Sequence, residues 1–339
     1  MDHDTPATTP GVPTSSGAAE VRDVRGSGLA GRLEREHSRL RAPTEVRDLA
    51  ASARLSAATP AAMLGRLAAI SVLYLIAASA GLAAETWWVW PMVWAIQSVL
   101  LLVCGAAMHE GIHANLTGNR GLDRWIAFSA GWLIFLPAAA YRPYHLQHHA
   151  TTISAADPSG ANARPFRSRR HYLLVMALSG PGFTAQMWSI AVRTLFGRSP
   201  EYVPARLRRQ MIAETVLALV AYLAIVVLGV LTGGLMVVAA VWVVPAVLGL
   251  CLVAPFVLTS EHYGAAEDRP LLESTATVDS NPVLAFVYLN NNHHTAHHLL
   301  SSCNPLRLPE VTAVVEDRIE LRHSSYTAFH RSVWRSLEW

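Results

Sequence analysis

Residues 88–113 read WVWPMVWAIQSVLLLVCGAAMHEGIH, an apolar run that ends in two histidines four positions apart. A helix that crosses the hydrocarbon core of a bilayer needs about 20 apolar residues, so 88–108 predicts a membrane-spanning helix. His109 and His113 follow it directly, and residues four apart on a helix share one face. The segment therefore predicts a histidine-bearing site at a membrane surface.

The composition of the whole chain is that of a membrane protein. Of its 339 residues, 52% are hydrophobic and 15% are charged, whereas a soluble domain carries about 25% charged residues. The mean hydropathy is +0.29. Three further segments are long and apolar enough to cross a bilayer: 66–84, 211–232 and 235–258. We therefore expect an all-α integral membrane protein with four transmembrane helices in two hairpins.

The segment 125–140 is apolar but short. If it crossed the membrane, the histidines before and after it would lie on opposite faces, so we expect a re-entrant or interfacial hairpin, which is tolerated where it packs against protein. All basic residues are arginines, and the two turns at the tips of the hairpins have none. Because positive charge marks cytoplasmic loops, we expect a cell-membrane protein with both termini and all histidine clusters in the cytoplasm.

Composition divides the chain into four regions. Residues 1–27 are rich in Thr, Ser, Pro and Gly, and we expect them to be disordered. Residues 28–60 have the Arg, Glu, Leu and Ala pattern of a cytoplasmic or interfacial amphipathic region. Residues 61–310 form the membrane domain with a cytoplasmic cap, and residues 311–339 are expected to be cytoplasmic helices.

Nine of the fifteen histidines fall into four clusters beside the apolar segments: His109 and His113; His145, His148 and His149; His262; and His294, His297 and His298. Imidazole is the commonest metal ligand near neutral pH, and nine imidazoles exceed what one zinc or iron ion uses. The clusters therefore predict two metal ions at one membrane surface. His293 is a weaker candidate, because the HxxHH frame selects His294.

Four other polar residues are candidates to orient the imidazole rings. Metal-bound histidines usually donate their second N–H to a carboxylate or a carbonyl group, and Glu110, Asp157, Glu261 and Asn290 lie beside the clusters. The alternative for each is a capping, turn or solvated role.

HEGIH also matches HExxH, in which two histidines bind zinc and the glutamate is the general base of a metalloprotease. This alternative uses Glu110 but leaves most of the clustered histidines without a role. A transport or binding protein is a further alternative.

The order HxxxH, HxxHH, HxxHH with two apolar hairpins resembles the membrane fatty-acid desaturase and hydroxylase superfamily over roughly residues 60–310. HHATTISAADP and TSEHYG, which holds His262, extend the resemblance. It implies two iron ions held by the nine histidines and O₂ as co-substrate. It also implies a lipid or acyl-thioester substrate and a separate electron donor, namely a ferredoxin, a rubredoxin or a cytochrome b5-like protein. We expect no nucleic-acid partner.

The box set and HHATTISAADP favour a fatty acyl desaturase. SEHYG favours the alternative, a membrane hydroxylase or alkane-type monooxygenase, as does Leu258, where relatives often carry an asparagine. Candidate walls of the alkyl site are Trp132, Phe135, Trp188 and Phe256, with plain packing as the alternative. Candidate partners of a phosphate or CoA group are Arg142, Arg164, Arg167, Arg169 and Arg170, with membrane anchoring as the alternative.

Overall fold

The computed structural model describes residues 43–51 and 60–339. These residues are mostly helical, as the all-α class predicts. The elements are α2 (Thr44–Ala51), α3 (Pro60–Ala83), η1 (Trp87–Val89), α4 (Trp90–Leu100), α5 (Leu102–His113), α6 (Arg120–Leu133), α7 (Ala138–Ala150), η2 (Gly160–Ala163), α8 (Arg169–Leu195), α9 (Ala205–Thr232), α10 (Leu235–Val238), η3 (Ala239–Val243), α11 (Val244–Leu248), η4 (Gly249–Val253), α12 (Ala254–Leu258), η5 (Thr259–Glu261), α13 (Leu271–Ser274), β1 (Ala276–Val278), α14 (Pro282–Val287), α15 (His294–Leu299), η6 (Pro305–Arg307), α16 (Leu308–Val315), η7 (Glu316–Arg318), β2 (Leu321–His323) and α17 (Tyr326–Ser336). The disorder predicted for 1–27 and most of the amphipathic region predicted for 28–60 lie outside the described residues.

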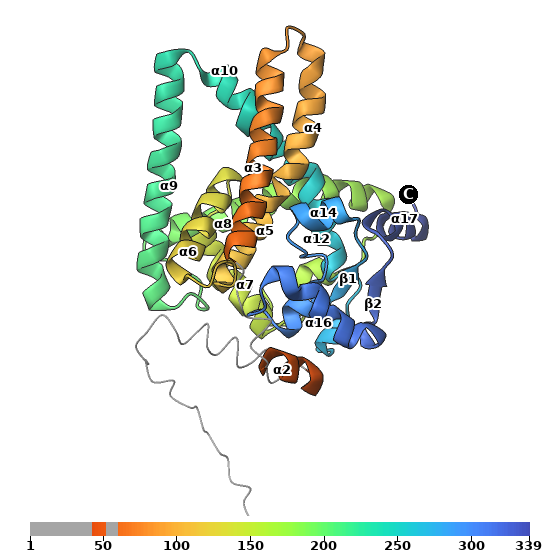
Figure 1. Ribbon diagram of the computed structural model, residues 1–339. Coiled ribbons are helices and arrows are strands. Elements are labelled where there is room, and N and C mark those ends of the chain that lie inside the picture. Colours follow the sequence, from red (N-terminus) through yellow and green to blue (C-terminus); the bar gives the residue numbers. More distant parts are fainter. Residues whose placement is uncertain (1–42, 52–59) are drawn as a thin grey trace, which may run out of the picture.

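Four helical segments in the described chain are long and apolar enough to cross a membrane: Pro60–Ala83, Trp87–His113, Ala205–Thr232 and Leu235–Glu261. They match the four segments that hydropathy predicts, except that the first ends at Ala83 and not at residue 84. The α3–α4 hairpin and the α9–α10 hairpin rise from the body in the same direction, with their turns at the top of Figure 1. Their apolar side chains, for example Leu75 and Leu231, are exposed, as contact with lipid requires. The chain is therefore an integral membrane protein.

The fourth span departs from an ideal α-helix at Ala239–Val243, a π-helical turn that precedes Pro245. Proline has no backbone N–H, so the carbonyl of Val241, four residues earlier, loses its usual helical partner. The hydroxyl of Tyr74 in α3 donates to this carbonyl at 2.6 Å. Since bilayer lipid offers no hydrogen bonds, this contact both satisfies the carbonyl and joins the two helical hairpins.

Helix α6 ends against aromatic side chains of other helices. Three carbonyls at its end and in the following turn accept hydrogen bonds: that of Trp132 from Tyr222 (2.8 Å), that of Leu133 from Trp242 (2.7 Å) and that of Phe135 from Trp188 (2.7 Å). Tyr222 lies in the third span and Trp242 in the fourth, so α6 ends at the depth of the spans. The segment 125–140 thus comprises the end of α6, a turn and the start of α7, and three of its carbonyl groups accept hydrogen bonds from side chains of other helices.

We expect Tyr222→Phe to lower the melting temperature of the purified protein in detergent by a few degrees. The substitution keeps the ring but removes one of the donors of the Trp132 carbonyl, which then accepts only from backbone N–H groups such as that of Phe135. The loss of one hydrogen bond between membrane helices costs about 0.6–1.7 kcal/mol. Tyr202→Phe is the matched control, because the Tyr202 hydroxyl makes no hydrogen bond within the described residues. An equal fall in both variants would contradict this role for Tyr222.

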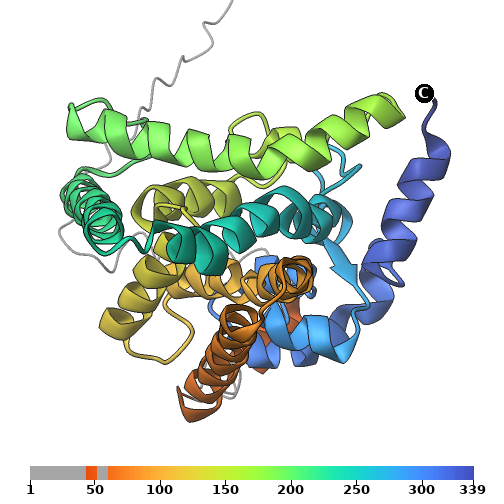
Figure 2. The ribbon, with the colours of Figure 1, turned by 90° about the horizontal axis from the view of Figure 1, so that it is seen from above.

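The C-terminal part of the chain forms a cap below the spans. Helices α15, α16 and α2 share one apolar core that includes Leu299, Leu308 and Val311. Strands β1 and β2 pair in parallel, with Ala276 opposite Leu321. The sequence predicted helices alone from residue 311 onward, whereas α16 begins at Leu308 and β2 separates it from α17. Seen from above, α8 and α17 run along two sides of the body (Figure 2).

Candidate metal centre

Five histidines from three helices form the first group: His109 and His113 from α5, His145 and His149 from α7, and His297 from α15. One ring nitrogen from each lies within 4.8 Å of those of all the others. The Nε2 atom of His149 lies 2.8 Å from Nε2 of His145 and 3.0 Å from Nε2 of His297. The end of the second span and two helices of the body therefore converge on one point.

Four histidines form the second group: His148 from α7, His262 after the fourth span, and His294 and His298 from α15. Their Nε2 atoms form a chain of contacts in the order His148, His298, His294 and His262, at 3.3, 3.0 and 3.0 Å. The structure thus brings all nine predicted histidines into two groups, one with five members and one with four.

The two groups take alternate members of each HxxHH cluster. On α7, His145 and His149 face the first group and His148 faces the second. On α15 the assignment is reversed, because His297 faces the first group and the outer two histidines face the second. Successive residues of an α-helix point about 100° apart, so one helix between two sites can supply ligands to both.

Carboxylates lie beside the Nδ1 atoms of three of these rings. Glu110, which is fully buried, has its Oε1 atom 2.8 Å from Nδ1 of His109 and 3.5 Å from Nδ1 of His297. Asp157 lies 2.9 Å from Nδ1 of His148. A carboxylate at Nδ1 fixes the ring orientation and leaves Nε2 as the ligand atom. Glu110 therefore supports the first group, and Asp157 supports the second.

Neutral groups hold two further rings. Nδ1 of His262 lies 2.9 Å from the carbonyl oxygen of Ser274, and the hydroxyl of Tyr141 lies 3.1 Å from Nδ1 of His145. A carbonyl oxygen only accepts, so the hydrogen of the neutral His262 ring is on Nδ1 and its Nε2 carries a lone pair.

The Nε2 contacts of the second group fit a metal ion better than they fit hydrogen bonds. In neutral rings, Nε2 of His148 and Nε2 of His262, at the two ends of the chain of contacts, are both acceptors, since each ring donates from Nδ1. Three successive hydrogen bonds would require one end to be a donor. A single cation accommodates all four lone pairs, and nitrogens about 2.1 Å from a metal lie roughly 3.0–3.4 Å apart. The residues therefore fit one ion per group.

Burial keeps the rings in the neutral form that binds metals. It lowers the pKa of several imidazoles well below its ordinary value, namely those of His145, His149, His294, His297 and His298. Burial also lowers the pKa of His262 to about 3. Burial raises the pKa of Asp157, but hydrogen bonds from His148 and from backbone N–H groups outweigh it and hold that pKa below its ordinary value. Asp157 is therefore ionised.

The remaining candidates for orienting the rings lie in different places. Glu261 Oε2 is 3.7 Å from Nε2 of His294, on the side of the ligand atoms, and its Oε1 accepts a hydrogen bond from Tyr288 at 2.8 Å. Asn290 has a turn role instead: its φ is 59° and its amide donates to the carbonyl of Pro305. Leu258, at the position where relatives often carry an asparagine, is 47% exposed to solvent.

Sequence reasoning missed Asn115, which holds Glu110 in place. Its amide donates to Glu110 Oε2 at 2.7 Å and to the carbonyls of Ser301 and Cys303 at 3.1 and 2.9 Å. It thereby ties the loop after α5 to the loop after α15. The HExxHxN spacing is local and visible in the sequence, but the partners in the second loop are 186 and 188 residues away.

We expect Asn115→Ala to lower the free energy of unfolding by about 1–3 kcal/mol, the usual cost of leaving buried polar partners unsatisfied. The same variant should lose metal from the first group only, because Glu110 supports that group. Chemical denaturation and metal analysis of the purified protein measure the two effects. Unchanged stability would exclude this role for Asn115.

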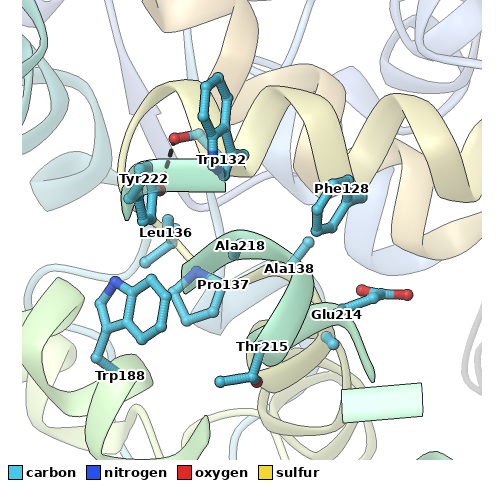
Figure 3. Close-up of a pocket in the computed structure, with 11 residues that line it drawn as sticks. Phe128, Trp132, Leu136, Pro137, Ala138, Trp188, Glu214, Thr215, Ala218 and Tyr222 are labelled. Carbon is cyan, nitrogen blue, oxygen red and sulfur yellow. Dashed lines mark hydrogen bonds between the residues drawn. The ribbon is translucent and has the colours of Figure 1, made fainter. Parts of the chain in front are cut away.

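The aromatic candidates for the alkyl site and the arginine candidates for an anionic group lie in different parts of the structure. Trp132 and Trp188 stand in the aromatic cluster around the end of α6 (Figure 3). Phe135 belongs to the same cluster, since its ring stacks on that of Trp242. Phe256 stacks on His330 instead. Arg169 lies over the rings of Trp334 and Trp339, which is a packing role. Arg142 lines a cavity beside His113.

The two histidine groups agree with the protein family to which the sequence is matched. A model of the fatty acid desaturase family matches residues 85–330, which is more than half of the chain and includes all nine histidines. Comparison with curated protein sequences gives no match.

Proposed function

Because the chain belongs to the fatty acid desaturase family, we propose that it is a membrane di-iron enzyme that uses O₂ to desaturate a fatty acyl chain. The observation that carries the proposal is the pair of buried histidine groups. Membership of the family makes the protein an oxidoreductase. We further propose that the site and both termini face the cytoplasm, since arginines surround the site and the hairpin turns have none.

In the proposed reaction, a –CH₂–CH₂– unit, O₂, two electrons and two protons give –CH=CH– and two water molecules. Two C–H bonds break and O₂ is reduced to water, so half of the four electrons come from the substrate and half from a donor. We propose a separate ferredoxin, rubredoxin or cytochrome b5-like protein as that donor. Iron supplies the redox chemistry with O₂ that zinc lacks.

The protein residues position and insulate the site. Glu110 and Asp157 fix the Nδ1 atoms of His109 and His148. His297 and His298 are almost inaccessible to solvent, which strengthens electrostatic interactions at the site.

The arrangement does not suit the zinc metalloprotease alternative. Both carboxylate oxygens of Glu110 are engaged, one with His109 and the other with Asn115, and the side chain is fully buried. A general base has to reach a water molecule and the substrate, whereas this carboxylate lies behind the rings.

The hydroxylase alternative shares the same nine histidines, and the SEHYG segment that holds His262 favours it, as does Leu258. It differs from desaturation only after the first C–H bond is broken. Product analysis therefore decides between the two.

The test is to purify the full chain, measure its metals, and analyse lipids by mass spectrometry after expression with an electron donor. Iron near two per chain and products that lack two hydrogens support the proposal. Products with one added oxygen would favour the hydroxylase, and one zinc per chain would overturn both.

A further inference from the structure

Glu261 is a carboxylate on the ligand side of the second histidine group. Its Oε2 atom lies 3.7 Å from Nε2 of His294, whereas Glu110 and Asp157 lie beside Nδ1 atoms. A carboxylate that orients a metal-bound ring contacts the nitrogen that faces away from the metal. Glu261 is on the other side of the ring of His294, so its position suits a different role.

The distance between Glu261 and His294 suits two ligands of one ion. Ligand atoms about 2.1 Å from a metal lie about 3.0 Å apart at a right angle and about 3.6 Å apart at 120°. The 3.7 Å between Oε2 and Nε2 is too long for a hydrogen bond but is close to the wider of these separations. An ion bound to Nε2 of His294 is therefore within reach of Oε2 of Glu261.

Tyr288 holds one oxygen of this carboxylate and leaves the other available. The hydroxyl of Tyr288 donates to Oε1 at 2.8 Å, while Oε2 makes no hydrogen bond within the described residues. No arginine of the described chain pairs with Glu261 either. A largely buried carboxylate is costly unless a cation compensates its charge, and a metal ion beside Oε2 supplies that charge.

The backbone that follows Tyr288 is strained. Leu289 and Asn290 have φ angles of 51° and 59°, in the left-handed region that residues other than glycine seldom adopt. Such conformations cost of order 1–3 kcal/mol each and persist where the surrounding structure holds them, often at functional sites. This segment joins Tyr288 to His294, so it places the donor to Glu261 and a ring of the second group side by side.

We propose that Glu261 binds the metal ion of the second group through Oε2, as its fifth protein ligand, an inference that rests on the two ions of the proposed function but not on its reaction. Glu261 belongs to neither group as its side chain stands, and rotation about the side-chain bonds brings Oε2 to the ion. The first ion then has five imidazoles as ligands, and the second has four imidazoles and one carboxylate.

This difference in ligands gives the two sites different metal preferences. Imidazole suits Fe, Ni, Cu and Zn, whereas carboxylate suits harder ions such as Mn²⁺. A carboxylate in the second group alone makes that group the tighter site for Mn²⁺. We therefore expect the metal-free wild-type chain to bind one Mn²⁺ more tightly than a second one.

The test titrates the metal-free full chain in neutral detergent with Mn²⁺ and follows the free ion by electron paramagnetic resonance. Glu261→Gln keeps the size of the side chain and removes its charge. It should weaken the tight Mn²⁺ site about tenfold or more, since even residues that only orient ligands are worth 10–100-fold. Glu267→Gln is the matched control, because Glu267 is exposed and belongs to neither group, and its titration should equal that of the wild type.

Two histidine variants identify the group that holds the tight Mn²⁺. His298→Ala should abolish the tight site, because this histidine belongs to the second group. His297→Ala should keep it, because that histidine belongs to the first group. The opposite result would place the tight Mn²⁺ among the five histidines of the first group and overturn the proposal.

Tyr288→Phe separates a ligand from a packing role. It removes only the hydroxyl that holds Oε1, so the carboxylate remains and Mn²⁺ affinity should fall less than in Glu261→Gln. The melting temperature of the metal-free protein should be no lower in Glu261→Gln than in the wild type, which establishes that this variant is folded. Equal losses of affinity in the two variants, or a metal-free Glu261→Gln protein that is unfolded, would assign Glu261 to packing and overturn the proposal.

Chelator titration of the iron-loaded chain distinguishes failure of this inference from failure of the proposed function. Glu261→Gln should weaken the ion of the second group and leave that of the first unchanged. Unchanged affinity for both ions would overturn the ligand role and leave the proposed function intact. Weaker binding of the second ion, in a protein that oxidises no lipid, would support the ligand role while the proposed reaction fails. A wild-type chain that binds only one metal ion would overturn both.

Discussion

Replacing His297 with alanine is expected to remove one metal ion and leave the other, so that iron falls from about two per chain to about one. His297 belongs to the first group only, and its Nε2 lies 3.0 Å from that of His149. His298→Ala should also leave about one iron, because that histidine belongs to the second group. Turnover should fall by more than about 100-fold in both variants, since even residues that merely orient ligands are worth 10–100-fold.

Double variants test the division into groups. His297→Ala combined with His298→Ala should leave no bound iron, whereas His294→Ala combined with His298→Ala should leave about one. His293→Ala is the control, because Nδ1 of His293 contacts the Thr312 hydroxyl at 2.9 Å and the residue belongs to neither group. Loss of iron in the control, or about two irons retained in both single variants, would refute the assignment.

The second large effect concerns the two carboxylates behind the rings. Glu110→Gln should weaken iron binding in the first group by about 10–100-fold, and Asp157→Asn should do the same in the second. Each substitution keeps the shape of the side chain but removes the charge that faces Nδ1 of His109 or of His148. Titration with a chelator measures both affinities in each variant, as two separate steps of iron release.

Glu310→Gln is the matched control for these carboxylates, since Glu310 is an exposed residue of the cap that pairs with Arg307. It should leave both steps of iron release unchanged. If Glu110→Gln and Asp157→Asn each weakened both ions equally, the carboxylates would not serve separate groups.

The spans were predictable because lipid contact imposes a local condition. About 20 successive apolar residues are needed whatever the rest of the fold does, and the four segments appear in the structure as Pro60–Ala83, Trp87–His113, Ala205–Thr232 and Leu235–Glu261. Strand β1 was not predictable, because three residues carry no clear period and their partner strand lies 45 residues further along the chain.

The polar residues around the histidines also show that sequence patterns predict local contacts and miss distant ones. Glu110 and Asp157 were predicted because they lie close in sequence to the histidines they contact. Arg120 and Arg124 were not, because only the packing of α6 against α5 brings them to the cavity beside His113, where Arg124 pairs with Glu214 of α9. Asn115 reaches Ser301 across 186 residues, a separation over which sequence patterns carry no information.

By itself, the sequence determined which side chains gather at the membrane surface, because helical spacing and the ends of apolar segments are local properties. Only the tertiary structure decided how the nine histidines divide. Adjacent residues such as His148 and His149 point about 100° apart on one helix, so each faces whichever helix packs on its own side. The arrangement of α5, α7 and α15 therefore sets the division into five and four.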